Sequence, residues 1–282
     1  MVALAKFSKQ SRVAGLVSCA AALTLALGWS NVAGAVGMAD FTPHRAVYEL
    51  DLSETQKSAG VARAGGVFEF EWTDACEGWT VSQRSRIEVA FDDGRAINFG
   101  WALNTWESKD GERYRFFLRR IYAGGEPEEV RGEAWMSESG GKATFKLPTT
   151  REVTLPKGTI FPTRHSIELM QAAKDKTLPL WRVVFDGAGD DGIYGVSAAP
   201  GVQVAPGSAP GLDSPLLEDQ ASWRLQLAFF GLGEDATEPE QEQRLRLFAN
   251  GIADQLTFDY GEFALDAKLS ELDSLPAMDC GG

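Results

Sequence analysis

The chain has 282 residues, with 44% hydrophobic and 24% charged side chains and a formal net charge of −13. Its 40 acidic residues outnumber its 27 basic residues. A surface of this sign repels phosphate backbones and anionic lipid headgroups, so the balance excludes nucleic-acid or membrane binding by bulk electrostatics. We therefore expect a soluble, acidic protein with no nucleic acid among its partners.

The first 35 residues have the pattern of a cleaved signal peptide. Lys6, Lys9 and Arg12 form a positive start, and residues 13–27 are apolar and uncharged. This stretch is shorter than the ~20 apolar residues of a membrane-spanning helix, and small residues at 33–35 suit a cleavage site. We predict export and cleavage after Ala35. The mature chain, residues 36–282, then has no transmembrane anchor and a net charge of −16, because the leader holds three basic and no acidic residues.

Cys19 allows a second interpretation of the leader. Residues 16–19, Leu-Val-Ser-Cys, resemble a lipoprotein signal, which would make Cys19 a lipidated N-terminus. Against this, most of the apolar stretch follows Cys19 instead of preceding it. We favour removal of Cys19 with the leader, and the sequence leaves lipidation open.

Cleavage leaves two cysteines, Cys76 and Cys280. In an exported chain, two cysteines are most simply explained by a disulfide. Two free thiols are the alternative. A metal site is less favoured, because neither a CxxC motif nor a histidine cluster accompanies the cysteines.

From Phe41 onward, short runs with a period of two predict β-strands, because alternate residues of a strand face opposite sides of a sheet. Turn residues at 92–94, 109–111 and 140–141 separate several of these runs. Short strands separated by turn residues at regular intervals predict an all-β sandwich or barrel, here in a single domain. The first expected strands cover residues 44–52, 66–72, 79–91, 97–106, 113–122, 130–136, 143–147 and 151–155.

One helix interrupts the strands. Residues 162–174 carry Ile167 and Met170 at helical spacing, and Pro162 suits the first turn of a helix. Strands are expected again at 180–185, 193–196 and 223–230. Between the last two, residues 200–215 are rich in Pro and Gly and predict a long exposed loop, and residues 234–243 predict an acidic loop.

The C-terminal part predicts a three-stranded meander. Apolar residues alternate along 244–249, 252–260 and 262–269. Asn250 and Gly251 separate the first two runs, and this pair favours a two-residue type I′ turn, in which both residues have positive φ. We therefore expect a β-hairpin centred on Asn250 and Gly251.

Candidate catalytic groups are few. His44 opens a strand and His165 lies in the helix, but neither is near a serine or cysteine nucleophile in a recognisable frame. Residues 186–192 resemble a calcium loop, but Ala188 stands where a ligand is needed, so a turn between strands is the better interpretation. No nucleotide-binding or hydrolase motif occurs in the sequence. We predict no catalytic, cofactor or metal site.

Several motifs together resemble the EipB-type cell-envelope integrity proteins, exported proteins of Gram-negative bacteria. They are HRAVYEL from His44, CEGW from Cys76, FPTRH at 161–165, VFDG at 184–187, and the segment from Asn250 to Phe263. The resemblance covers about residues 41–275. It implies a periplasmic protein folded as a curled, many-stranded antiparallel β-spiral or incomplete barrel, similar to lipoprotein-carrier folds. It also places the family's cysteine pair on Cys76 and Cys280 and its helix on residues 162–174.

Two functions follow from this resemblance. The first is a non-catalytic role in envelope integrity, exerted through envelope proteins as partners. The alternative is a carrier that binds lipid or lipoprotein on the concave face, and an enzyme comes third. A cavity lined by Trp and Phe would favour the carrier, whereas a filled interior would favour the structural role.

Overall fold

The computed structural model describes residues 41–55, 60–189, 191–208, 211–233, 236–259, 262–276 and 278–280. The expected signal peptide, including Cys19 and the cleavage site after Ala35, lies outside the described residues. In the described part of the chain, no helix is both long and apolar enough to cross a bilayer.

The described residues form one continuous antiparallel sheet and one helix, which confirms the predicted all-β spiral. The N-terminal strands are β1 (His44–Thr55), β2 (Val61–Asp74), β3 (Gly78–Phe91), β4 (Ala96–Ser108), β5 (Arg113–Tyr122), β6 (Glu128–Ser137), β7 (Gly140–Leu147) and β8 (Arg151–Leu155). After helix α1 (Pro162–Lys174), the strands are β9 (Leu180–Phe185), β10 (Ile193–Val204), β11 (Ser222–Phe230), β12 (Gln241–Phe248), β13 (Ala253–Asp259) and β14 (Phe263–Ser274).

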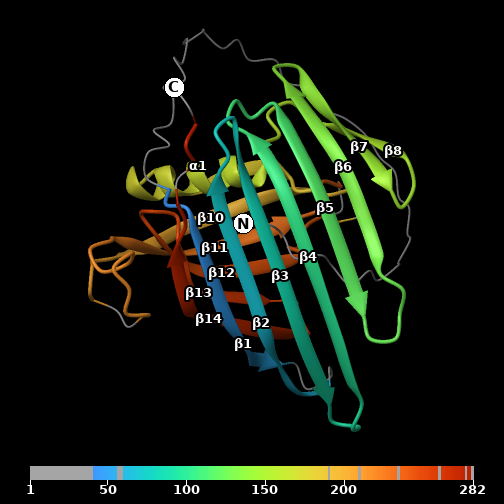
Figure 1. Cartoon of the computed structure of the whole chain (residues 1–282), viewed down its shortest axis with the longest axis vertical. Coiled ribbons are helices and arrows are strands. Elements are labelled where there is room, and N and C mark those ends of the chain that lie inside the picture. The colour runs from blue at the N-terminus through green and yellow to red at the C-terminus, as the bar shows by residue number, and fades with distance from the viewer. Residues whose placement is uncertain are drawn as a thin grey trace.

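The strand order places the two ends of the sequence at the centre of the sheet. The order is β8-β7-β6-β5-β4-β3-β2-β1-β14-β13-β12-β11-β10-β9, so β1 pairs with both β2 and β14. Strands β8 and β9, which are neighbours in sequence, therefore form the two outer edges. The sheet curls so that β10–β14 lie behind β1–β5, with α1 across one end (Figure 1).

The segment before helix α1 and strand β5 both bond to β9 and the residue that follows it. Before the helix, the Ile160 N–H donates to the Val183 carbonyl (2.9 Å), and the Phe185 N–H donates to the Ile160 carbonyl (3.0 Å). After β9, the Tyr114 hydroxyl donates to the Asp186 carbonyl (3.2 Å). These bonds connect the β9 edge to the opposite half of the spiral. They also satisfy edge groups that would otherwise invite pairing with another chain.

The interior is largely filled by side chains from the inward face of each strand. One large cluster packs the central and C-terminal strands against Leu169, Met170 and Ala173 of α1. A second cluster lies under β5–β8 and is rich in aromatic rings, where Tyr114 stacks on Phe161 with centroids 4.9 Å apart. The alternation of apolar and polar residues in the sequence thus corresponds to a packed inner face and a solvent-exposed outer face of the sheet.

The segment predicted as a long exposed loop at 200–215 is more ordered than that. Strand β10 continues to Val204, with a register shift after Ala199. Further on, Leu217 is buried, and the Leu216 carbonyl accepts a hydrogen bond from the Asn250 side chain (2.8 Å). The loop prediction was therefore wrong for residues 200–204, which continue β10, whereas residues 205–208 and 211–215 lie outside strands and are mostly exposed, as predicted.

The hairpin at Asn250 and Gly251 is present, but its predicted type is wrong. Only Gly251 has a positive φ (84°). The Gly251 N–H donates to the Phe248 carbonyl, and the Phe248 N–H donates to the Ile252 carbonyl. The loop therefore has three residues, a turn followed by a left-handed glycine, which is the next most common hairpin class. A Cβ on Gly251 would lie 2.3 Å from the ring of Phe41.

The predicted disulfide between Cys76 and Cys280 is present, with the two Cα atoms 5.5 Å apart. Cys76 lies in the β2–β3 turn, and Cys280 lies beyond the end of β14. The bond closes a loop with a sequence separation of 204 residues. It therefore fastens the C-terminal tail to an early hairpin of the sheet.

Replacing Gly251 tests the hairpin. Gly251→Ala should lower the free energy of unfolding by roughly 1–3 kcal/mol for the left-handed backbone, plus the cost of displacing Phe41. Gly94→Ala is the matched control, because Gly94 has nearly the same φ (85°) and open space around it. Denaturant titration should show the larger loss for Gly251→Ala, and Gly251→Val should lose still more. Equal losses at the two glycines would contradict the Phe41 contact.

Removing the disulfide tests its contribution to stability. By chain entropy, a loop of 204 residues is worth about 5 kcal/mol at most, because strain and residual unfolded structure subtract from it. Cys76→Ser, Cys280→Ser and the double variant should lose similar amounts in denaturant titrations of unreduced protein. A wild-type midpoint that is unchanged by reductant would show that the bond does not stabilise the fold.

Candidate functional site

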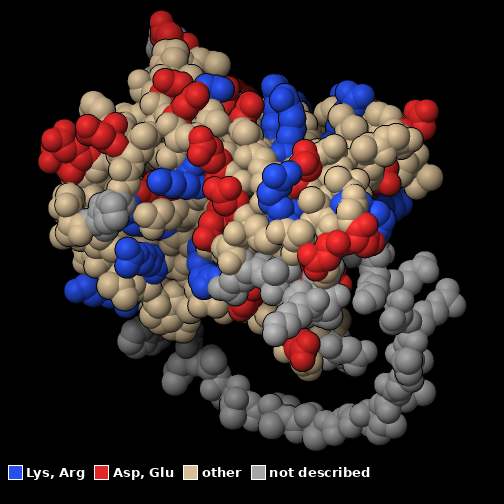
Figure 2. Space-filling view, turned by 90° about the horizontal axis from the view of Figure 1, so that it is seen from below, with Lys and Arg blue, Asp and Glu red and all other residues tan. Residues whose placement is uncertain are grey.

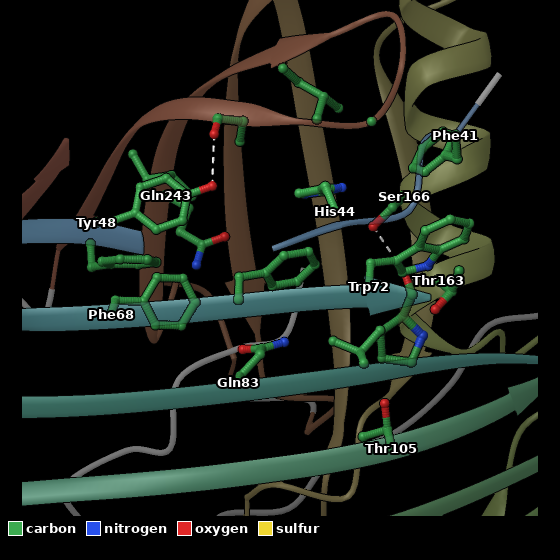
Figure 3. A pocket seen from close by; sticks show the side chains of 18 residues that line it. Phe41, His44, Tyr48, Phe68, Trp72, Gln83, Thr105, Thr163, Ser166 and Gln243 are labelled. Carbon is green, nitrogen blue, oxygen red and sulfur yellow. Dashed lines mark hydrogen bonds between the residues drawn. The ribbon is translucent and has the colours of Figure 1, made fainter. Parts of the chain in front are cut away.

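An aromatic pocket lies inside the spiral, between the N-terminal turn of α1 and the central strands (Figure 3). Its walls come from both ends of the chain, because β1 and β2 face β12 and β13 across it. The lining side chains are mainly aromatic and aliphatic. They belong to Phe41, His44, Tyr48, Phe68, Phe70, Trp72, Val81, Gln83, Thr105, Pro162, Thr163, Ser166, Gln243, Leu247, Gly251, Ala253, Leu256 and Phe258.

The free space in this pocket is small, about 70 Å³. For comparison, a cavity of roughly 150 Å³ lined by apolar side chains holds one benzene. The interior is therefore mostly filled by the protein's own rings, such as Phe68, which contacts Tyr48, Trp101 and Phe258. As described, the pocket has room for a short group but not for a whole acyl chain.

Among the residues that the structure describes, two polar atoms in the pocket wall are buried without a hydrogen-bond partner. They are the indole Nε1 of Trp72, which can only donate, and Oε1 of Gln243, which accepts. Burying a polar group without a partner costs about 1–3 kcal/mol. A donor and an acceptor left open in an otherwise apolar pocket are the features that would orient a bound group.

Two other polar residues of the pocket, His44 and Tyr48, have hydrogen-bond partners. Nδ1 of His44 donates to the Thr42 carbonyl (2.7 Å), and the ring lies 5.5 Å from that of Phe70. Burial lowers the pKa of His44, so its imidazole is neutral near pH 7. The Tyr48 hydroxyl donates to the Ala253 carbonyl (2.7 Å), and burial raises the pKa of this phenol above its usual value. The pocket is therefore lined by neutral groups.

Glu107 of β4 holds the helix at the edge of the pocket. Phe161, the N-cap residue of α1, offers no side-chain hydrogen bond, and the first turn has no acidic residue. The Glu107 carboxylate accepts the backbone N–H groups of Thr163 (2.7 Å) and Arg164 (2.8 Å) instead. A strand side chain thus satisfies two of the free N–H groups at the start of the helix. Burial raises the pKa of Glu107 to about 7, against the lowering effect of these two bonds.

His165 lies on the same helix but is not among the residues that line the pocket. Its side chain is buried, and its Nε2 has no hydrogen-bond partner in the described part of the chain. Burial, with the positive charge of Arg182 in addition, lowers the pKa of His165 to about 3. The structure therefore does not bring the two histidines together in one site.

The turn predicted at residues 186–192 connects β9 and β10. The Asp186 carboxylate accepts the Ala188 N–H (2.8 Å), and the Asp186 N–H donates to the Gly192 carbonyl (2.8 Å). These are bonds within a turn. Across the described ranges, no group of three or more His, Cys, Asp or Glu side chains is placed to hold a metal ion.

Sequence reasoning missed Glu107, Trp72 and Gln243 as site residues. The sequence does signal that some acceptor is needed, though not which one, because a helix that begins with Phe-Pro and has no Ser, Thr, Asp or Asn cap needs an acceptor from elsewhere. No comparable signal marked Gln243 and Trp72, because their meeting depends on the pairing of β1 with β14.

Glu107 and His165 should oppose each other in the pH dependence of stability. A raised pKa at Glu107 adds stability below about pH 4.5, and this is lost as the pH rises through about 7. A lowered pKa at His165 adds stability above about pH 6.5, and this is lost as the pH falls toward about 3. From pH 6.5 to 4.5 the two contributions cancel in the wild type.

Single variants should separate these two contributions. Glu107→Gln should lose stability on acidification from pH 6.5 to 4.5, with a limiting slope of about 1.4 kcal/mol per pH unit, whereas His165→Gln should gain stability over that range. Denaturant midpoints measured at several pH values test this. Parallel profiles for the wild type and both variants would show that neither group titrates in this range.

Comparisons with known proteins agree with this architecture. Residues 35–276 match the family model described as EipB-like. The chain is 32% identical over 266 residues to the cell envelope integrity protein EipB of Brucella abortus (strain 2308), covering 91% of this chain and 94% of the relative. It also superimposes on the crystal structure of a beta-barrel-like protein of domain of unknown function DUF1849 from Brucella abortus. That match has a TM-score of 0.75 at 28% identity and covers 84% of this chain and 99% of the other. This chain belongs to the EipB-like family.

Proposed function

We propose that this protein supports the integrity of the cell envelope from the periplasm and does so without catalysis. The observation that carries the proposal is the relationship, over nearly the whole of both chains, to a Brucella protein named for envelope integrity. The expected signal peptide and the disulfide suit an oxidising compartment outside the cytoplasm.

The state of the two histidines supports the non-catalytic part. A general base needs a pKa near the working pH and reach to a substrate. The Nδ1 proton of His44 is held by the Thr42 carbonyl, and His165 is enclosed with its pKa lowered to about 3. Neither histidine is therefore set up for proton transfer at neutral pH. We propose that the fold acts as a rigid surface for envelope partners.

A carrier of lipid or lipoprotein is the second candidate. The aromatic pocket and the open polar atoms of Trp72 and Gln243 favour it. The filled interior opposes it, because a free volume of about 70 Å³ is too small for an acyl chain. Native mass spectrometry of protein purified from its own periplasm distinguishes the candidates. The structural role predicts the mature mass alone, and a lipid adduct would favour the carrier.

Complementation tests the envelope role in the host cell. Deleting the gene should sensitise cells to detergents and cell-wall antibiotics, and the full chain should restore resistance. A chain lacking residues 1–35 should fail, because it stays in the cytoplasm. His44→Gln should complement fully if the role is non-catalytic. Normal resistance of the deletion strain, or rescue by the leaderless chain, would contradict the proposal.

A further inference from the structure

The outer face of the sheet carries a trough that is separate from the aromatic pocket. It runs along β4 between β3 and β5 and has a volume of about 630 Å³. These strands lie side by side at the front of Figure 1, with the other half of the spiral behind them. The outward positions of β4 form its floor, and those positions hold Gly100 and Ala102.

The trough is a depression along β4 because the outward side chains of this strand are small here. The inward neighbours Phe99, Trp101 and Leu103 are large, whereas Gly100 has no side chain at all. A Cβ on Gly100 would lie 2.8 Å from the Ser85 carbonyl oxygen, so the backbones of β3 and β4 approach closely here. The trough thus forms because the outward residues of β4 are small and the backbones of β3 and β4 lie close together.

Arginines line both sides of the trough, on β3 and on β5. The ladder aligns Arg84 of β3 with Ala102 and then Arg119 of β5 across the floor. One row further along, it aligns Arg86 with Gly100 and then Ile121. Strands β3 and β5 lie two inter-strand spacings apart, which is about 10 Å. The trough therefore presents three guanidinium groups beside an apolar side chain, since Ile121 is 46% exposed.

Two of these arginines lack a close carboxylate. In the described part of the chain, neither Arg84 nor Arg86 has a carboxylate oxygen within 4.0 Å, although Glu69 lies opposite Arg84 on β2. Arg119 is 3.7 Å from Glu129, and Glu88 at the end of the trough is 3.5 Å from Arg63. Elsewhere, acidic and basic side chains are intermixed, as on the face in Figure 2. Arg84 and Arg86 thus lack a close carboxylate among the described residues, although acidic residues outnumber basic ones in this chain of net charge −13.

We propose that this trough binds an extended acidic segment of a partner protein. Arg84 and Arg86 point outward two residues apart, about 6.8 Å along the strand, and an extended peptide presents alternate side chains at the same spacing. A Glu-x-Glu sequence would place two carboxylates against the two guanidinium groups. The β3, β4 and β5 backbones are already paired, so recognition rests on side chains. A broad anionic membrane is disfavoured, because the net acidic protein repels it.

Two isomeric peptides test the spacing. One fluorescein-labelled peptide, Ser-Thr-Glu-Val-Glu-Thr-Ser, presents both carboxylates on one side of an extended chain. The other, Ser-Thr-Glu-Glu-Val-Thr-Ser, has the same charge but presents them on opposite sides. Fluorescence anisotropy with the mature, disulfide-intact protein at low salt should show tighter binding of the first peptide. Equal binding would overturn the proposal, because only charge would then matter.

Protein variants test the site. Arg84→Glu combined with Arg86→Glu should weaken binding of the first peptide by about tenfold or more, because charge-assisted bonds become repulsion. Arg224→Glu combined with Arg244→Glu, on the outward faces of β11 and β12, makes the same change in net charge and should change binding less than about twofold. Equal effects of the two charge changes would overturn the proposal.

Filling the trough tests its shape without changing charge. Ala102→Trp should block the first peptide, whereas Asn104→Trp, at the next outward position of β4, should not. Unchanged binding by Ala102→Trp, with the fold verified by near-UV circular dichroism, would overturn the proposal. Phosphatidylglycerol vesicles form the last arm. Vesicle binding that depends on Arg84 and Arg86, without peptide binding, would assign the trough to a membrane and overturn the proposal.

Discussion

The pairing of β1 with β14 is the constraint on which the rest of the structure depends. It joins the first and last strands over eleven aligned positions, from His44–Ser274 to Thr55–Phe263. Closing a chain of this length is entropically costly, but each added pair satisfies backbone groups and buries inward side chains. Because the ends occupy the centre, the outer edges of the sheet fall to β8 and β9, and the segment before α1 pairs with the β9 edge.

The same pairing creates the aromatic pocket. Its walls combine residues from β1 and β2 with residues from β12 and β13, which meet only because β14 lies between them in the sheet. The disulfide reinforces this arrangement, since Cys280 follows β14 and Cys76 lies next to β2. Glu107 then positions α1 over the pocket from β4. The helix is therefore held by the sheet, and its position decides how much space the pocket has.

The two faces of the sheet have different properties. The inner face is aromatic, neutral and mostly filled, which suits a stable structural element with one small pocket. The outer face is charged and open, and around β4 it has small residues between arginines. A protein that binds partners through its outer surface needs a well-packed interior that keeps this surface in one shape. This division is consistent with a structural role in the envelope more than with transport of a large apolar cargo.

Much of the fold could be predicted from local sequence. Period-two alternation located the strands, Ile167 and Met170 located the helix, and the count of cysteines after cleavage identified Cys76 and Cys280. Long-range contacts could not be predicted in this way. The pattern around Asn250 predicted a hairpin but not its turn type, and the packing of Leu217, just after the Pro- and Gly-rich segment, was not predicted.

The candidate site was less accessible to sequence reasoning than the fold. Glu107 lies 55 residues or more from the helix it caps, and Gln243 lies far in sequence from Trp72. Residue type alone gives no reason to single out one glutamate or glutamine among many. Their roles follow from strand register, which is set by the whole set of inward-facing side chains together.

Native-state hydrogen exchange of the disulfide-intact protein tests the central role of the β1–β14 pairing most directly. If the chain ends hold the centre of the sheet, amides of β1 and β14 should exchange only through global unfolding, and amides of the β8 edge should exchange much faster through local opening. Exchange of β1 or β14 amides as fast as those of β8 would contradict this account.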